Sequence, residues 1–136
     1  MIQKSYCNLF KDDRGTLIEI FNQPFLESRG LSFGQVYCLT FSKKGVVRGN
    51  HYHLNQHEMF AVLSGTVKVI FLDILTNERY EEVVLAEAQR TCIYSFGPKI
   101  AHAVVALSDN ALLLSHSTKV YDPDDLDKYE FNLVDA

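Results

Sequence analysis

Residues 45–65 read GVVRGNHYHLNQHEMFAVLSG and hold three of the five histidines of the chain and one glutamate between their terminal glycines. If this stretch begins with a strand over residues 46–53, the two-residue period of a strand puts His51 and His53 on the same face. A turn after His53 then brings Glu58 back beside them on the partner strand. The stretch therefore predicts a patch of sheet on which three ionisable side chains meet.

The histidine pair also has a purely structural explanation, because two histidines on a strand are often solvated or satisfied by backbone hydrogen bonds. The flanking residues favour a functional role. Glu58 opens the apolar run MFAVL, and a carboxylate at the start of an apolar strand needs a partner. We therefore interpret His51, His53 and Glu58 as parts of a functional site.

Length and composition describe one domain. The chain has 136 residues, 47% of them apolar, and a formal net charge of -4, so we expect a single domain over residues 1–136. Since Lys and Arg do not cluster, we expect no nucleic-acid partner. No apolar run is long enough for a signal peptide or a membrane span, so we expect a cytoplasmic protein without a membrane partner. Cys7, Cys38 and Cys92 are widely separated and are expected to be free thiols.

Short apolar segments recur between turn signals, and this rhythm predicts an all-β fold. The expected strands are residues 6–10, 16–21, 33–41, 46–53, 58–63, 66–73, 79–85, 91–96, 101–107 and 111–117. Nine or ten strands in one small domain must close on themselves or pair with a partner to hide their edges. This requirement favours a barrel or jelly roll.

The remaining segments are expected to connect or cover these strands. Residues 22–30 read as a loop with at most one helical turn, and residues 86–90 as a polar crossing. The strand over residues 16–21 has apolar side chains on both of its faces, so we expect both faces to be covered. The acidic residues from Tyr121 onward predict an irregular or short helical tail that packs on the outside.

The spacing of the glycines, His51, His53 and Glu58 within residues 45–65 resembles the first motif of the cupin superfamily. His102, which follows the turn Gly97-Pro98, resembles the histidine of the second cupin motif. The resemblance implies a cupin jelly-roll barrel in which His102 joins the other three side chains in the lumen.

The chain also resembles the cupins that act on nucleotide-linked 4-keto-6-deoxy sugars. This resemblance rests on Asp13-Arg14-Gly15, Arg48-Gly49, Leu107-Ser108 and Tyr121-Asp122-Pro123. Two branches of these cupins fit. The 3,4-ketoisomerases share Arg-Gly-x-His-x-His, the Gly-Pro-x-x-x-His of residues 97–102, the Tyr-Asp pair and a chain of this size. The dTDP-4-dehydrorhamnose 3,5-epimerases share Arg-Gly-x-His, the later histidine and the tyrosine, but usually have Gln at position 53 and a Lys near Glu58. The pattern favours the ketoisomerase, which converts a 4-keto sugar to a 3-keto sugar in deoxysugar biosynthesis, with the epimerase as the alternative.

The resemblance implies catalytic roles for His51, His53 and Tyr121. A 4-keto group acidifies the hydrogen on C3, so the reaction needs a base at C3 and a group that stabilises the enediolate oxygen. His51 is the expected base, because histidine titrates near neutral pH. His53, on the same face, is the expected carrier of protons between O3, O4 and C4. Tyr121 is the expected proton donor or oxyanion partner.

Four residues are expected to bind the substrate, which we expect to be linked to dTDP. Arg48 suits the diphosphate, because a guanidinium matches phosphate oxygens. Its parity relative to His51 is wrong for a regular strand, and a bulge at Gly49 would correct it. Arg14 is a second candidate for the diphosphate, and His102 and Glu58 are expected to line the sugar site.

Two other classes of function stay open. The first is a metal-dependent cupin, in which His51, His53, Glu58 and His102 would hold Zn, Mn, Ni or Fe. The second is a cupin that binds sugar without turnover. The sugar-nucleotide branch implies no metal and no other cofactor. We also expect a homodimer, in which the segment up to Phe10 pairs with the sheet of a neighbouring copy.

Overall fold

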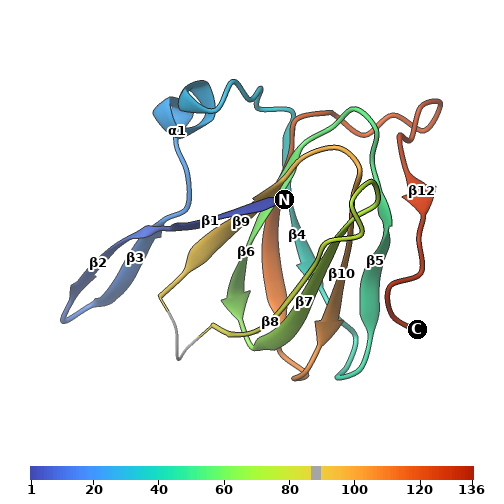
Figure 1. Ribbon diagram of the computed structural model, residues 1–136. Coiled ribbons are helices and arrows are strands. Elements are labelled where there is room, and N and C mark those ends of the chain that lie inside the picture. Colours follow the sequence, from blue (N-terminus) through green and yellow to red (C-terminus); the bar gives the residue numbers. More distant parts are fainter. Residues whose placement is uncertain (87–89) are drawn as a thin grey trace.

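The computed structural model describes residues 1–86 and 90–136, and it is a sandwich of two antiparallel sheets with a projecting hairpin (Figure 1). The first sheet has the order β1 (Ile2–Tyr6), β9 (Cys92–Phe96), β6 (Glu58–Ser64), β11 (Leu112–Ser117), β4 (Gln35–Thr40). The second has the order β12 (Tyr129–Glu130), β5 (Val47–Tyr52), β10 (Ile100–Ala106), β7 (Thr66–Asp73), β8 (Arg79–Leu85). The expected all-β jelly roll is confirmed.

The core lies between the two sheets and is built on four aromatic rings, Phe60, Phe71, Tyr94 and Phe96. Their ring centroids lie 5.2–6.2 Å apart, in stacked, tilted and edge arrangements that aromatic pairs prefer. The rings come from β6, β7 and β9, whose apolar side chains are buried on both faces for much of their length. This packing closes the centre of the sandwich and leaves the lumen open towards β4 and β5.

A half-buried carboxylate joins the two sheets at the opposite side, where β1 and β8 lie. Glu82 on β8 accepts hydrogen bonds from Lys4 Nζ at 2.7 Å, Tyr80 Oη at 2.6 Å and Tyr94 Oη at 2.8 Å. Lys4 belongs to β1 and Tyr94 to β9, so one side chain of the second sheet holds two strands of the first.

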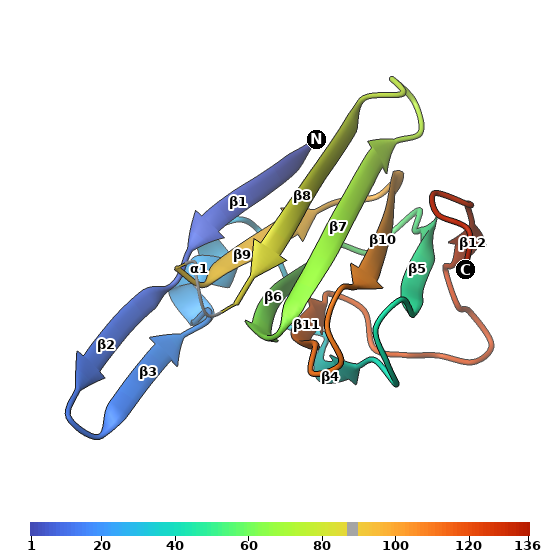
Figure 2. The same ribbon diagram turned by 90° about the horizontal axis from the view of Figure 1, so that it is seen from below.

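The N-terminal strands differ from the expected ones. The strand predicted over residues 6–10 is interrupted at Cys7, which is buried and donates its N–H to Thr91 O at 2.9 Å. The chain therefore leaves the first sheet after β1, and β2 (Asn8–Asp12) pairs with β3 (Gly15–Glu19) in a hairpin that projects away from the sandwich (Figures 1 and 2). The prediction that residues 16–21 are covered on both sides is wrong for the single chain, because Leu17 on β3 is 63% exposed.

The other predicted strands are present, with ends that differ by no more than two residues. The loop over residues 22–30 contains one short helix, α1 (Gln23–Ser28), whose first turn is capped by Asn22 Oδ1, which accepts the Phe25 N–H at 2.9 Å. All three cysteines are free, as predicted. Residues 87–89 of the predicted polar crossing lie outside the described residues. In the described part of the chain no helix is long and apolar enough to cross a membrane.

The C-terminal tail follows the edge of the second sheet and forms only the two-residue strand β12, without a helix. The tail lies on the outside, as expected, and its exposed residues Asp125, Leu126 and Lys128 also line the mouth of the cavities described below. The tail is tied down by Asn50, whose Nδ2 donates to Val134 O at 2.7 Å and whose Oδ1 accepts the N–H of Leu133 at 3.0 Å.

Candidate active site

The predicted meeting of His51, His53 and Glu58 is confirmed, and His102 joins them. His51 lies near the end of β5, His53 directly after it, Glu58 at the start of β6 and His102 on β10. The ring centroid of His51 is 4.9 Å from that of His53 and 4.7 Å from that of His102, and the other two are 5.3 Å apart. Four ionisable groups from three strands therefore share one end of the lumen.

Glu58 contacts two of the imidazoles, and its side chain is largely but not fully buried. Its Oε1 lies 3.0 Å from His53 Nε2 and its Oε2 lies 3.4 Å from His102 Nε2. Burial alone would raise the pKa of Glu58, but His102 and His53 hold this pKa well below its ordinary value. Burial alone would likewise lower the pKa of His53, and the Glu58 carboxylate raises it instead. Glu58 is thus ionised at neutral pH, and His53 retains its second proton more readily than a free histidine.

Each of the three histidines turns its Nδ1 to a backbone carbonyl, and the acceptors are Gly49 O at 3.1 Å from His51, Asp127 O at 2.6 Å from His53 and Ile100 O at 3.0 Å from His102. Nδ1 therefore carries the proton of a neutral ring, and Nε2 is the atom left for chemistry. His51 differs from the other two because, among the described residues, no carboxylate oxygen lies within 4.0 Å of its ring nitrogens.

His51 is a neutral imidazole. Burial and the charges of His102 and His53 lower the pKa of His51 to about 3. The ring is therefore unprotonated at neutral pH, with a free lone pair on Nε2. An unprotonated ring can accept a proton, although its lowered pKa departs from the near-neutral titration expected of His51 from the sequence.

The bulge expected at Gly49 is confirmed. Strand β10 pairs His102 with His51 and Ala103 with Gly49, so Asn50 is an extra residue in β5. Gly49 has a φ of +92°, and a Cβ built there would lie only 2.6 Å from His102 O, so the close approach of the two strands requires glycine. The bulge lets Arg48 line the same cavity as His51.

Two cavities of about 320 Å³ each meet at His51, and their sizes suit a small organic ligand. The first opens towards the loops and the C-terminal segment. The second lies deeper, against apolar side chains of the lumen such as Phe60 and Leu113. Both are lined by His51, Tyr37, Glu58 and Lys128.

Most of the predicted site residues line these cavities. His53 and Tyr121 line the first, and Arg48 and His102 line the second. Arg14 lines neither, because it lies at the tip of the projecting hairpin, where its side chain is 86% exposed and pairs with Asp12.

Tyr37, Asp127 and Lys128 are among the residues of the site that were not predicted. Tyr37 on β4 lines both cavities, and burial and the Glu58 charge raise the pKa of its phenol, so the hydroxyl keeps its proton. Tyr37, Leu39 and Phe41 are spaced two residues apart, so a strand puts them on one face, and this spacing could have indicated that Tyr37 faces the lumen. Asp127 and Lys128 have no such signal in the sequence, because they follow an irregular acidic segment.

The donor set also fits a divalent metal ion. One ligand atom each of His51, His53 and His102 lies within 4.8 Å of the others, and Glu58 contacts two of these rings. Imidazole nitrogens with one carboxylate are ligands that Zn, Mn, Fe and Ni accept.

Comparison with known protein families identifies the family of the chain. A model of the dTDP-4-dehydrorhamnose 3,5-epimerase family matches residues 4–135. The chain belongs to this family. The match covers the hairpin, the residues that line both cavities and the C-terminal segment, so membership in the family rests on nearly the whole chain.

Individual relatives are distant. The chain is 27% identical to a UDP-2-acetamido-2,6-beta-L-arabino-hexul-4-ose reductase of Pseudomonas aeruginosa, over 89% of the chain and 30% of the reductase. It is 28% identical to a dTDP-4-dehydrorhamnose 3,5-epimerase of Methanothermobacter thermautotrophicus, over 85% of the chain and 66% of the epimerase. The chain thus spans less than two thirds of either curated relative. The structure of QdtA, a sugar 3,4-ketoisomerase from Thermoanaerobacterium thermosaccharolyticum in complex with TDP, matches 93% of the chain and 85% of QdtA with a TM-score of 0.75 and 21% identity, which shows the shared fold.

Proposed function

We propose that this protein is a sugar-nucleotide 3,4-ketoisomerase, which converts a dTDP-linked 4-keto-6-deoxyhexose to the 3-keto sugar. The observation that carries the proposal is that a neutral histidine, His51, and a protonated phenol, Tyr37, line the same two cavities. Isomerisation needs one base for the carbon-bound proton and one group that exchanges a proton between two neighbouring oxygens. The family of the chain and its likeness to QdtA support this substrate class.

The proposed reaction begins when His51 Nε2 removes the proton from C3. The electron pair of the C3–H bond forms a C3=C4 bond, and the carbonyl pair moves onto O4. Tyr37 donates its proton to O4 and takes the proton of the O3 hydroxyl. The O3 pair then forms the new carbonyl at C3, and C4 takes the proton back from His51. Atoms and charge balance, and no redox partner is needed.

We assign His53 a supporting role in this scheme. The residue pattern suggests His53 as the proton carrier, but its Nδ1 faces Asp127 O at 2.6 Å and its Nε2 faces Glu58 at 3.0 Å. A ring with both nitrogens occupied holds its position and its charge, and Tyr37 is better placed to exchange protons. Glu58 and His102 then complete the wall against which the sugar lies, and Arg48 takes the diphosphate.

A 3,5-epimerase is the second candidate, and the position of Tyr121 favours it. Tyr121 lines the first cavity together with His51 and is 68% exposed, so its hydroxyl is free to serve the opposite face of a sugar. An epimerase needs such a second group, because the proton must return from the side opposite the base.

Product analysis by NMR after reaction in D2O with dTDP-4-keto-6-deoxyglucose separates the two. We expect a carbonyl at C3, deuterium at C4 and an untouched hydrogen at C5. Deuterium at both C3 and C5 with a persistent 4-keto group would contradict the isomerase and establish the epimerase. Binding of the sugar nucleotide without any turnover would establish a binding protein instead.

A metal-dependent reaction is a further candidate, because the donor set fits a metal. A divalent ion held by His51, His53, Glu58 and His102 would polarise an oxygen of the substrate. Metal analysis of the purified protein, followed by assays after chelation, tests this. Loss of activity that one divalent ion restores would favour the metal enzyme over the metal-free reaction.

We also propose that the protein is a homodimer. The projecting hairpin and the end of β1 expose large apolar side chains, with Tyr6 at 58%, Phe10 at 59% and Leu17 at 63% exposure. A second copy packed on the hairpin would cover them. Arg14 at the hairpin tip could reach a diphosphate only in the site of that second copy. Sedimentation of the wild type and of Phe10→Glu tests this, and a wild type that is monomeric at micromolar concentration would contradict it.

A further inference from the structure

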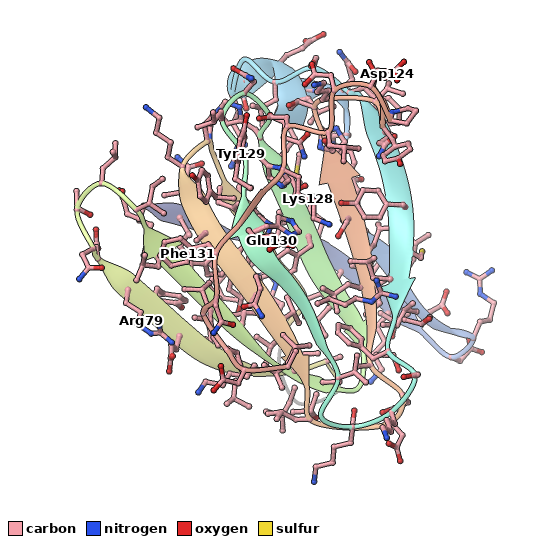
Figure 3. The ribbon with its side chains drawn as sticks, turned by 90° about the vertical axis from the view of Figure 1, so that its right-hand side faces the viewer. Arg79, Asp124, Lys128, Tyr129, Glu130 and Phe131 are labelled. Carbon is pink, nitrogen blue, oxygen red and sulfur yellow. The ribbon has the colours of Figure 1, made fainter. Side chains whose placement is uncertain are left out.

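Lys128 lies between the C-terminal tail and the two cavities of the site. It is one of the few side chains that line both cavities, together with His51, Tyr37 and Glu58. Figure 3 shows Lys128 on the C-terminal segment that passes in front of β5, next to Tyr129. A segment that reads as a surface tail therefore places a lysine in the lining of the same two cavities as the base.

The backbone on both sides of Lys128 is held in place. Before it, Asp127 accepts the backbone N–H groups of Leu54, Asn55 and Gln56 at 2.8, 2.9 and 3.1 Å. After it, β12 pairs with the end of β5, and Tyr129 stacks on Tyr52 at a ring-centroid distance of 5.4 Å. These contacts restrict Lys128 to the mouth of the lumen although its side chain is exposed to solvent.

The charge of Lys128 is not neutralised by a nearby acid. In the described ranges of the chain, no carboxylate oxygen lies within 4.0 Å of Lys128 Nζ. Lys119, the other lysine of the first cavity, is paired with Asp125 at 2.8 Å. Arg48 lines only the second cavity, where its Nε donates to Thr40 O at 2.8 Å. Lys128 is thus the unpaired cation common to both cavities that meet at His51.

We propose that the Lys128 ammonium stabilises the negative charge that forms on the substrate when His51 removes the C3 proton. The inference rests on the proposed function. As the C3–H bond breaks, its proton moves to His51 Nε2, the pair forms the C3=C4 bond, and the charge collects on O4. A fixed positive charge beside that oxygen favours the transition state over the neutral 4-keto substrate. Lys128 keeps its own proton throughout.

Lys128→Met and Lys128→Arg test this role, with Lys68→Met as a matched control. Lys68 lies on β7, outside both cavities, and pairs with Glu81 at 3.2 Å. Loss of one group that stabilises an oxyanion lowers kcat on the order of 10²-fold. We therefore expect a fall of about this size in Lys128→Met, with KM changed by less than about threefold. Lys128→Arg should recover part of the rate, and Lys68→Met should behave as the wild type.

The same set of measurements separates the outcomes. Melting curves and dTDP titration calorimetry for each variant establish that the fold and the nucleotide site are retained. An active wild type whose Lys128→Met variant keeps full kcat, or changes only KM, would overturn the role in charge stabilisation. A wild type that turns over no 4-keto sugar nucleotide would overturn the proposed function, and this inference with it.

Discussion

Replacement of Gly49 by alanine tests whether the bulge in β5 depends on the close approach of β10. Gly49 has a φ of +92°, and a Cβ there would lie 2.6 Å from His102 O and 3.0 Å from Ala103 Cα. Both neighbours are backbone atoms of β10 and cannot rotate away. Gly45→Ala is a matched control, because Gly45 has a φ of +93° and no heavy atom within 4 Å of its Cβ position.

The two variants differ in their free energy of unfolding only by the overlap of the new Cβ with the backbone of β10 in Gly49→Ala. A non-glycine residue at positive φ costs on the order of 1–3 kcal/mol in either variant. The stiffer unfolded chain favours both alanines by a similar amount, so this term cancels. The displacement of β10 adds an overpacking cost of about 1–3 kcal/mol in Gly49→Ala alone. We therefore expect Gly49→Ala to be less stable than Gly45→Ala by that difference.

Urea unfolding and thermal melting measure the difference. For a domain of this size, 1 kcal/mol corresponds to roughly 3–5 °C in Tm, so the two variants should differ by at least about 3 °C. The activity of Gly49→Ala should also fall, because a shift of β10 moves His102 and the strand that carries His51. Equal unfolding free energies for the two alanine variants would show that the overlap with β10 does not destabilise Gly49→Ala.

Four further predictions address the site and the sheet contact at β8. His51→Asn removes the base but little volume, so turnover should fall about 10²- to 10⁴-fold while calorimetry still detects dTDP-sugar binding; a near wild-type rate would exclude His51 as the base. Arg48→Ala should raise KM more than it lowers kcat in steady-state assays, because a diphosphate contact acts equally on substrate and transition state. Burial alone would raise the pKa of Glu82, but hydrogen bonds from Lys4, Tyr80 and Tyr94 lower it. The stabilisation by this carboxylate is therefore present above its ordinary pKa of 4.5 and is lost as pH falls through the lowered value. Urea unfolding at a series of pH values should show that this fall in pH lowers the free energy of unfolding of the wild type more than that of Glu82→Gln. Exhaustive chelation should leave turnover unchanged, because the 4-keto group acidifies C3–H without a metal, and rescue by one added ion after a loss would contradict this.

The sequence by itself determined most of the strands and the centre of the site. Side chains of a strand alternate between faces, so the spacing of His51 and His53 was enough to place them together, and a short turn was enough to return Glu58 to them. The bulge was predictable as well, because Arg48 had the wrong parity and glycine followed it. Each of these conclusions depends on the local geometry of one strand or one turn.

The tertiary structure alone decided which distant segments complete the site and which leave it. Lys128 and Asp127 lie in a tail with no periodic pattern, and the turn after His53 holds that tail across the mouth of the lumen. The alternation of β4 predicts which face Tyr37 shares with Leu39. Only the pairing of β4 with β11 puts that face in the lining of the cavities that His51 also lines. The hairpin of β2 and β3 projects because Cys7 is buried against Thr91 and ends β1 early. Strand parity is a property of neighbouring residues, whereas closure of a lumen depends on contacts between residues more than seventy positions apart, such as Asp127 with Leu54.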